Sequence, residues 1–240
     1  MRLRVTLDSV GENTLDLNYS YHLASLIYRS IERADQSLSL SLHKPRVFKF
    51  FTFSKLMPSK GRFRIEGDRM IIDNSVHFFF STMKREIGAK LVEGLLTKPE
   101  VKIGDAEFVV SEIKVMREDE IGEKEKFVTL SPINVTTAEE SGNGRLRIVD
   151  LYPDNPRFYE NLRRNLVRKY ETFYGKQPDN SDLRLKVLST KKKRIRIKNT
   201  FHRCVEMVFE AGGSKELLEV GYKAGFGERN SMGFGMVKVV

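Results

Sequence analysis

The chain is poor in the residues that build covalently or metal-stabilised scaffolds. Its 240 residues include a single cysteine, Cys204, and no tryptophan. One thiol cannot form an internal disulfide, and it excludes zinc and iron–sulfur sites that need several cysteines. We therefore expect ordinary hydrophobic cores, for which 40% hydrophobic and 31% charged residues are a typical globular composition.

Long apolar runs are absent as well. No stretch approaches the ~18 consecutive apolar residues that a membrane-spanning helix requires. Residues 1–7 alternate charged and apolar side chains, which predicts a strand rather than a secretory signal. We expect a cytoplasmic protein that has no membrane partner.

Acidic residues are scarce in one part of the chain. The sequence has 42 Lys and Arg against 32 Asp and Glu, a formal net charge of +10. Residues 157–203 contain 15 of these bases and only 4 of the acids, so this stretch carries the whole excess. A concentrated basic patch attracts polyanions and gains affinity by releasing their counterions. This pattern favours a nucleic-acid partner over the solvated face of a thermophilic protein, in which both signs are enriched together.

Hydrophobic periodicity predicts an α+β fold with two similar halves. The first half contains a strand (2–7), a helix (21–31), a Pro-containing connection (42–54), hairpin strands (63–65 and 70–72), a strand (76–80), a helix (83–96) and a strand (108–116). The second contains a strand (127–135), a polar break (139–144), a strand (146–149) and a helix (158–173). Two strands around a lysine cluster (183–188 and 194–198), a third strand (204–209), a short helix (215–222) and a final strand (233–240) follow. This order fits two tandem ferredoxin-like (βαββαβ, RRM-like) domains, 1–118 and 127–240, joined by a charged linker at 119–126.

The segment 225–235 carries two Gly-Phe-Gly tripeptides separated by five residues. Glycine weakens both helices and strands, but it lets backbone N–H groups converge on an anion. No Gly-Lys-Ser/Thr follows, so the segment is not a Walker A loop. The alternative is a hairpin-like turn before the last strand. We predict RNA-binding residues here: Gly225, Gly227, Arg229, Asn230, Gly233 and Gly235.

A second RNA-binding candidate is the basic segment 191–198. Its cations are Lys191, Lys192, Lys193, Arg194, Arg196 and Lys198. Strand alternation puts the last three on one face, where they suit successive phosphates, and turns Ile195 and Ile197 toward the core. The alternative is an edge strand that its charge protects against aggregation.

The paired Gly-hydrophobic-Gly tripeptides near the end of a tandem βαββαβ chain resemble the RAMP superfamily of CRISPR-associated proteins. Within it, the sequence is most similar to the repeat-processing endoribonucleases (the Cas-six family). Besides the glycine-rich segment, the likeness includes residues 26–28, 42–43, 49–54, 127–133 and 220–222.

This resemblance implies a metal-independent endoribonuclease that cuts CRISPR repeat RNA. The tyrosine, histidine and lysine that it implies in the first domain fall on Tyr28, His43 and Lys49. Tyr28 and His43 would exchange protons with the 2′- and 5′-oxygens, and Lys49 would stabilise the phosphorane. No His, Asp or Glu cluster has metal-ligand spacing, so we expect neither a metal nor a cofactor.

The resemblance leaves partners and alternatives open. The implied partner is single-stranded CRISPR repeat RNA, held along the cleft between the domains, with a CRISPR effector complex and a homodimer as further possibilities. One alternative is a non-cleaving RNA-binding paralogue or effector-complex subunit of the same superfamily. Another is a general two-domain RNA-binding module.

Overall fold

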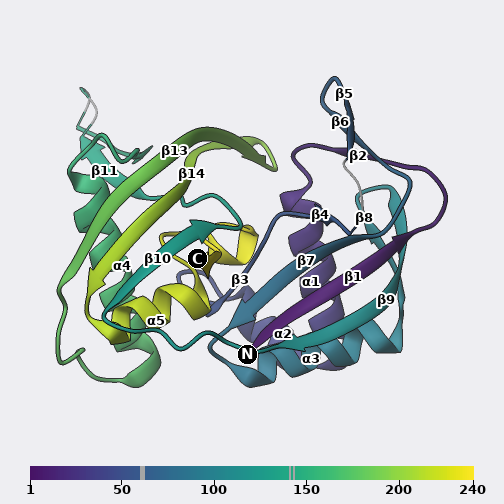
Figure 1. The fold of residues 1–240 in the computed structure, drawn as a ribbon, viewed down its shortest axis with the longest axis horizontal. Helices are drawn as coiled ribbons and strands as arrows, with labels where there is room; N and C mark the ends of the chain where they lie inside the picture. Colours follow the sequence, from purple (N-terminus) through teal and green to yellow (C-terminus); the bar gives the residue numbers. More distant parts are fainter. Residues whose placement is uncertain (60–62, 141, 143) are drawn as a thin grey trace.

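A computed structural model describes residues 1–59, 63–140, 142 and 144–240, which form two α+β halves lying side by side (Figure 1). The predicted fold class, two tandem ferredoxin-like domains, is confirmed. One buried cluster of side chains runs from Leu3 to Phe108 and a second from Ile121 to Val237. The exact domain boundaries stay a prediction, and β10 begins at Lys124, inside the predicted linker. Among the described residues, no helix has the length and apolar character needed to cross a membrane.

The first half is an antiparallel sheet with two helices packed on it. The strand order is β3 (Phe51–Phe53), β7 (Val76–Thr82), β1 (Arg2–Ser9), β9 (Ala106–Met116) and β8 (Glu100–Ile103), with β4 (Met57–Pro58) also paired to β7. A smaller sheet has the order β2 (Asn13–Asp16), β6 (Arg69–Ile72) and β5 (Arg64–Glu66). Leu3, Val5 and Leu7 of β1 are fully buried, as the period of two predicts. They pack with the apolar faces of α1 (Ser20–Ala34) and α3 (Arg85–Thr97).

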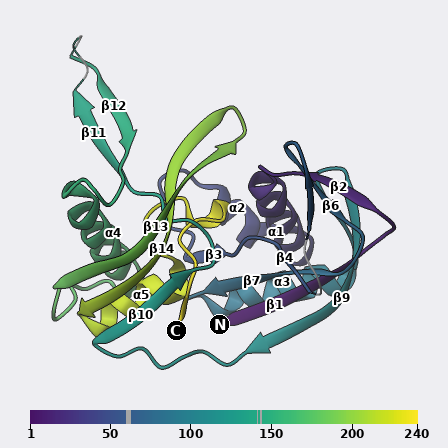
Figure 2. The ribbon, with the colours of Figure 1, turned by 45° about the horizontal axis from the view of Figure 1, so that its top comes forward.

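The second half has its own sheet and helices. The strand order is β13 (Leu183–Ile197), β14 (Thr200–Gly213), β10 (Lys124–Thr129) and β15 (Val237–Val239), and α4 (Arg157–Tyr174) and α5 (Lys215–Ala224) pack against it. Phe158, Leu162 and Leu166 of α4 are fully buried, which matches their four-residue spacing. A separate hairpin, β11 (Thr136–Glu140) and β12 (Leu146–Asp150), projects from the body (Figure 2).

The strongly periodic elements are confirmed, and several weaker ones differ. The strands β2, β4 and β8 and the helix α2 (Gln36–His43) were not predicted, and β3 lies within the segment predicted as a connection, 42–54. Residues 139–140 of the predicted polar break belong to β11, while 141 and 143 lie outside the described residues. The strand predicted at 127–135 ends at Thr129, after which Ile133 makes an isolated bridge. The strand predicted at 233–240 is confined to β15, because the glycine-rich loop extends to Gly235.

The prediction of two strands around the lysine cluster is wrong, because β13 is one continuous strand. It pairs with β14 from Leu183 to Ile197 with a single register shift between Val187 and Ser189. Main-chain ladder bonds do not depend on side-chain polarity, so the lysines sit on the ladder as exposed side chains. The hairpin arches toward the first half (Figure 1), and Ile195 and Ile197 are half-buried rather than part of either core.

Candidate active site

Tyr28 and His43 meet on two consecutive helices of the first half. The carboxylate of Asp35 accepts a hydrogen bond from the amide of Leu38 at 2.8 Å, which caps α2 directly after α1 and folds it back. The ring centroids of Tyr28 and His43 are 4.8 Å apart, tilted by 33°. Tyr28 is buried, with its ring edge-on to Phe51, whereas His43 is exposed at the last position of α2. The structure therefore brings together two of the three predicted catalytic side chains.

Lys49 reaches the same place from the loop that follows α2. Arg46 and Phe50 have left-handed backbone angles, φ 58° and 56°, which bend this loop. The Lys49 ammonium donates a hydrogen bond to the main-chain oxygen of Lys44 at 2.5 Å. Partial burial lowers the pKa of Lys49. Burial raises the pKa of Tyr28, against the opposite effect of a hydrogen bond from Ser231.

These three side chains line one cleft of about 600 Å³, and the second half supplies part of its wall. Ile197 and Lys198 come from the β13–β14 hairpin, and Ser231 and Met232 come from the glycine-rich loop. The tip of the hairpin is attached to the first half: the Arg196 amide donates to the Asn18 side chain at 3.0 Å. Both halves thus build the site.

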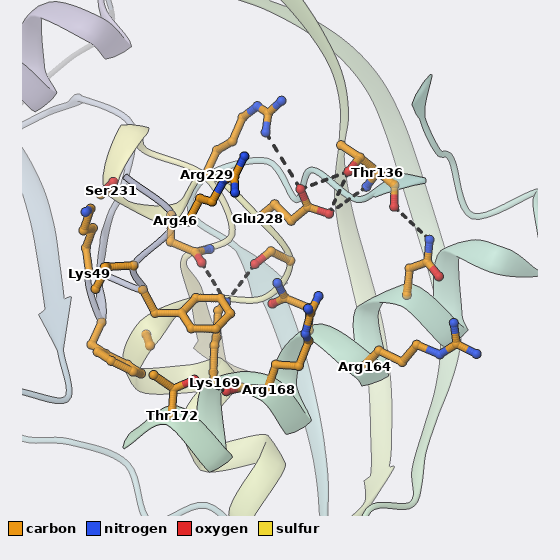
Figure 3. A pocket seen from close by; sticks show the side chains of 18 of the residues that line it. Arg46, Lys49, Thr136, Arg164, Arg168, Lys169, Thr172, Glu228, Arg229 and Ser231 are labelled. Carbon is orange, nitrogen blue, oxygen red and sulfur yellow. Dashed lines mark hydrogen bonds and ion pairs between the residues drawn. The ribbon is translucent and has the colours of Figure 1, made fainter. Parts of the chain in front are cut away.

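A larger cleft of about 1030 Å³ lies next to the first. Arg46, Lys49 and Ser231 line both clefts, so the two are adjacent. Arg164 and Arg168 lie on adjacent turns of α4 and form the wall opposite Lys49 and Ser231 (Figure 3). The exposed or half-exposed charged side chains that line this cleft are Arg46, Lys49, Arg164, Arg168, Arg229, Glu171 and Glu228. Cations prevail, so this surface suits a polyanion.

The glycines of the loop 225–235 serve close packing. A Cβ on Gly233 would lie 2.6 Å from the Phe53 ring, and one on Gly235 would collide with the main-chain oxygen of Phe226. The amides of Gly225, Gly233 and Gly235 already donate to main-chain oxygens within the protein. These three amides therefore have internal partners, and RNA binding by Gly225, Gly227, Arg229, Asn230, Gly233 and Gly235 stays a prediction.

Several of the six cations predicted along 191–198 have partners within the protein, and their binding to RNA stays a prediction. Lys198 lines the cleft of Tyr28, while Arg196 pairs with Asp16 at 3.5 Å. Lys192 pairs with Asp154 at 2.9 Å, Lys193 lies 3.9 Å from Glu206, and the Arg194 guanidinium stacks 3.9 Å from the Phe201 ring centroid. Lys191 is exposed. The position of Lys198 beside Tyr28 depends on docking of the two halves and has no signal in the sequence, as is also true of Ser231.

Within the described part of the chain, no group of three or more His, Cys, Asp or Glu side chains has the geometry to hold a metal ion. Beside the carboxylates of Glu32, Glu171 and Glu228, the polar groups of the clefts are mostly cations, amides and hydroxyls, which suit phosphate and base edges.

The tandem ferredoxin-like halves and the basic cleft that both of them line define a class of two-domain α+β proteins with a surface suited to a polyanion. Residues 14–114 match the family described as CRISPR-associated protein Cas6, N-terminal, and residues 116–239 match CRISPR associated protein Cas6, C-terminal. The chain belongs to the Cas6 family.

Two relatives with curated names are 40% identical to the chain. One is "CRISPR-associated endoribonuclease Cas6 1" of Methanocaldococcus jannaschii, matched over 99% of this chain and 92% of the relative. The other is "CRISPR-associated endoribonuclease Cas6" of Pyrococcus furiosus, matched over 92% of this chain and 82% of the relative. A third, from Pyrococcus horikoshii, is 33% identical over both full lengths and is named a putative "endoribonuclease-like protein Cas6nc".

Solved structures share the whole fold. The structure titled "An RAMP protein binding different RNA substrates" has a TM-score of 0.91 and 34% identity, covering 100% of this chain and 99% of its own. The structure titled "CRISPR associated protein Cas6" has a TM-score of 0.86 and 38% identity, with the same coverage.

Proposed function

We propose that the protein binds single-stranded CRISPR repeat RNA and cleaves precursor CRISPR RNA into guide RNAs without a metal ion. The observation that carries this proposal is the meeting of Tyr28, His43 and Lys49 in one cleft, with ring centroids of Tyr28 and His43 4.8 Å apart. The names of the relatives at 40% identity support the substrate class and the reaction.

The chemistry follows from the three side chains. The 2′-hydroxyl at the cut site attacks the adjacent phosphorus, and the bond to the 5′-oxygen breaks. Tyr28 and His43 carry the two proton transfers, one from the 2′-oxygen and one to the 5′-oxygen. The ammonium of Lys49 stabilises the added negative charge of the phosphorane. The products carry a 5′-hydroxyl and a 2′,3′-cyclic phosphate, which can open to a 3′-phosphate.

The two adjacent clefts support a path for the RNA strand. A strand with its scissile phosphate beside Tyr28 passes Lys49 and Arg46 into the larger cleft, where Arg164 and Arg168 face it. Single-stranded RNA fits such a track because its backbone follows the cations while its bases remain free to stack or bond. The half-buried Phe48 in the wall offers a stacking surface.

Active-site variants test the proposal. End-labelled repeat RNA is incubated with wild type, Tyr28→Phe, His43→Ala and Lys49→Ala, and His22→Ala serves as the control because this exposed α1 histidine lies outside both clefts. We expect one cut per repeat, and a rate at least about 100-fold lower for Tyr28→Phe and His43→Ala, the usual contribution of a proton-transfer group. Equal rates for His43→Ala and His22→Ala would contradict the assignment of His43.

A non-cleaving RNA-binding member of the family is the second candidate. The structure titled as an RAMP protein that binds different RNA substrates has the higher TM-score, 0.91 against 0.86 for the one titled Cas6. Sequence-selective binding of the repeat without a cut by wild type would select this candidate. Delivery of the product to a CRISPR effector complex and homodimerisation stay predictions.

A further inference from the structure

Lys169 is a fully enclosed lysine that takes no part in the cleavage chemistry described above. It lies on α4 with 2% of its surface exposed, and its ammonium points into the glycine-rich loop (Figure 3). It donates hydrogen bonds to the main-chain oxygens of Gly225 and Gly227 and to the side-chain oxygen of Asn230, each at 2.7 Å. An ammonium has three N–H donors, so all of them are used, and a buried charge is tolerated only when it is satisfied in this way.

Asn230 extends this attachment across the loop. While its oxygen accepts from Lys169, its amide nitrogen donates to the main-chain oxygen of Phe226 at 3.3 Å and to that of Phe234 at 3.0 Å. One side chain therefore ties both Gly-Phe-Gly tripeptides to α4. The loop has only a short 3₁₀ turn of its own, Asn230–Met232, so these bonds help to fix its position, together with main-chain bonds such as that from the Gly235 amide to the Pro132 oxygen.

The next residue, Ser231, contacts the candidate active site. Its side chain lines the same cleft as Tyr28, where the 3₁₀ turn packs against α1, and its hydroxyl, as a hydrogen-bond partner, lowers the pKa of Tyr28. Ser231 also lines both clefts. A hydrogen bond thus joins Lys169 to Asn230, and the next residue, Ser231, reaches the cleft that Tyr28 lines, so the connection runs from the second half of the protein to the first.

We propose that Ser231 and Lys169 are positioning residues for cleavage: Ser231 orients the Tyr28 hydroxyl, and Lys169 holds the loop that presents Ser231. The proposal rests on the proposed function, in which Tyr28 transfers a proton. It assigns the glycine-rich loop a role in the active site of the other half, besides any contact with RNA. A purely structural Lys169 would stabilise the loop without a specific link to Tyr28.

Single-turnover cleavage of repeat RNA tests the step at Ser231. Ser231→Ala should lower the rate about 3- to 10-fold, the size of one neutral hydrogen bond, and leave the RNA affinity and Tm unchanged. Ser231→Thr keeps the hydroxyl and should restore most of the rate. Ser37→Ala removes an exposed α2 hydroxyl outside both clefts and should cleave like wild type.

A double-mutant cycle tests the step at Lys169. Lys169→Met should slow cleavage at a temperature where the variant is folded, and adding Ser231→Ala should lower the rate less than about twofold further, because the two residues act through one contact. Should Lys169→Met fail to fold, Asn230→Ala takes its place in the cycle, since it removes the same link to the loop.

The outcomes distinguish a failure of the positioning role of Ser231 and Lys169 from a failure of the proposed function. A wild-type rate for Ser231→Ala alongside a large loss for Tyr28→Phe would overturn the role of Ser231 and leave cleavage by Tyr28 intact. If the fold-losses in cleavage rate of Lys169→Met and Ser231→Ala multiply in the double variant, the link between the two residues is overturned. A wild-type rate for Tyr28→Phe would overturn both the role of Tyr28 and the positioning role of Ser231 and Lys169.

Discussion

Substitution of Gly235 by alanine distinguishes a packing role of the glycine-rich loop from a purely RNA-binding one. Gly235 has φ +78°, and an added Cβ would collide with the main-chain oxygen of Phe226 and lie 2.7 Å from the Asn230 amide nitrogen. The Phe226 amide donates to the Gly235 oxygen at 2.8 Å, so the two Gly-Phe-Gly segments of the loop cannot separate without losing this bond.

The expected loss of stability has two parts. A left-handed backbone costs an L-residue roughly 1–2 kcal/mol, and overpacking against rigid backbone costs roughly 1–3 kcal/mol. The free energy of unfolding should therefore fall by about 2–5 kcal/mol, which lowers Tm by at least about 4 °C in a chain of this size.

Two glycines offer matched controls for the thermal unfolding assay. Gly175 has φ +70° with nothing within 4 Å of an added Cβ, so Gly175→Ala carries only the backbone cost. Gly142 also has open space and shows no left-handed φ, so Gly142→Ala should leave Tm unchanged. A Tm for Gly235→Ala no lower than that of Gly175→Ala would refute the reasoning. So would a Gly235→Ala variant that keeps its stability and loses only RNA affinity.

Three further predictions concern charge and titration. The double variant Arg164→Gln, Arg168→Gln should reduce the slope of log affinity against log salt by about 1.4, because it removes two contacts to phosphates of a single strand. The control Arg33→Gln, on α1 and outside both clefts, should leave the slope unchanged. Equal slopes for the double variant and wild type would place the RNA elsewhere. Burial, followed by the charge of Arg229, lowers the pKa of His202, whose Nδ1 accepts from Arg229 at 3.1 Å. As the pH drops, the His202 imidazole therefore takes up a proton more readily in the unfolded chain than in the folded one, and the free energy of unfolding should fall below about pH 6.5. In thermal unfolding, the Tm of His202→Gln should drop less between pH 7.5 and 5.5 than that of wild type. Burial raises the pKa of the Cys204 thiol to about 12, so iodoacetamide at pH 8 should label it only after unfolding; rapid labelling of the native protein would contradict its burial.

Sequence periodicity predicted the elements whose burial follows a single pattern. β1 fully buries its alternating Leu3, Val5 and Leu7, α4 buries one regular face, and both lie close to their predicted ranges. The helix α2 escaped prediction because Leu38, Leu40 and Leu42 alternate like a strand, while Leu40 is in fact 64% exposed. The cap at Asp35 and the packing of Leu42 in the core decide the helix instead.

The site was predictable only within one half. Tyr28, His43 and Lys49 lie within 22 residues of one another in the sequence and came from family resemblance. The contributions of Ser231, Ile197 and Lys198 depend on how the second half docks, which local patterns do not encode. The loop glycines were expected to gather backbone amides around an anion, but three of those amides are bonded internally. The conformational freedom of glycine suits both roles, so the sequence could not separate them.

Metal-independent attack by the 2′-hydroxyl is the central claim, and one cleavage assay tests it most directly. End-labelled repeat RNA is incubated with the protein in EDTA, beside the same RNA carrying a single 2′-deoxy sugar at the cut site. The account predicts a single cut in EDTA, a 2′,3′-cyclic phosphate on the upstream product, and no cut of the deoxy substrate. Cleavage of the deoxy substrate at the wild-type rate, or cleavage that requires an added divalent ion, would contradict it.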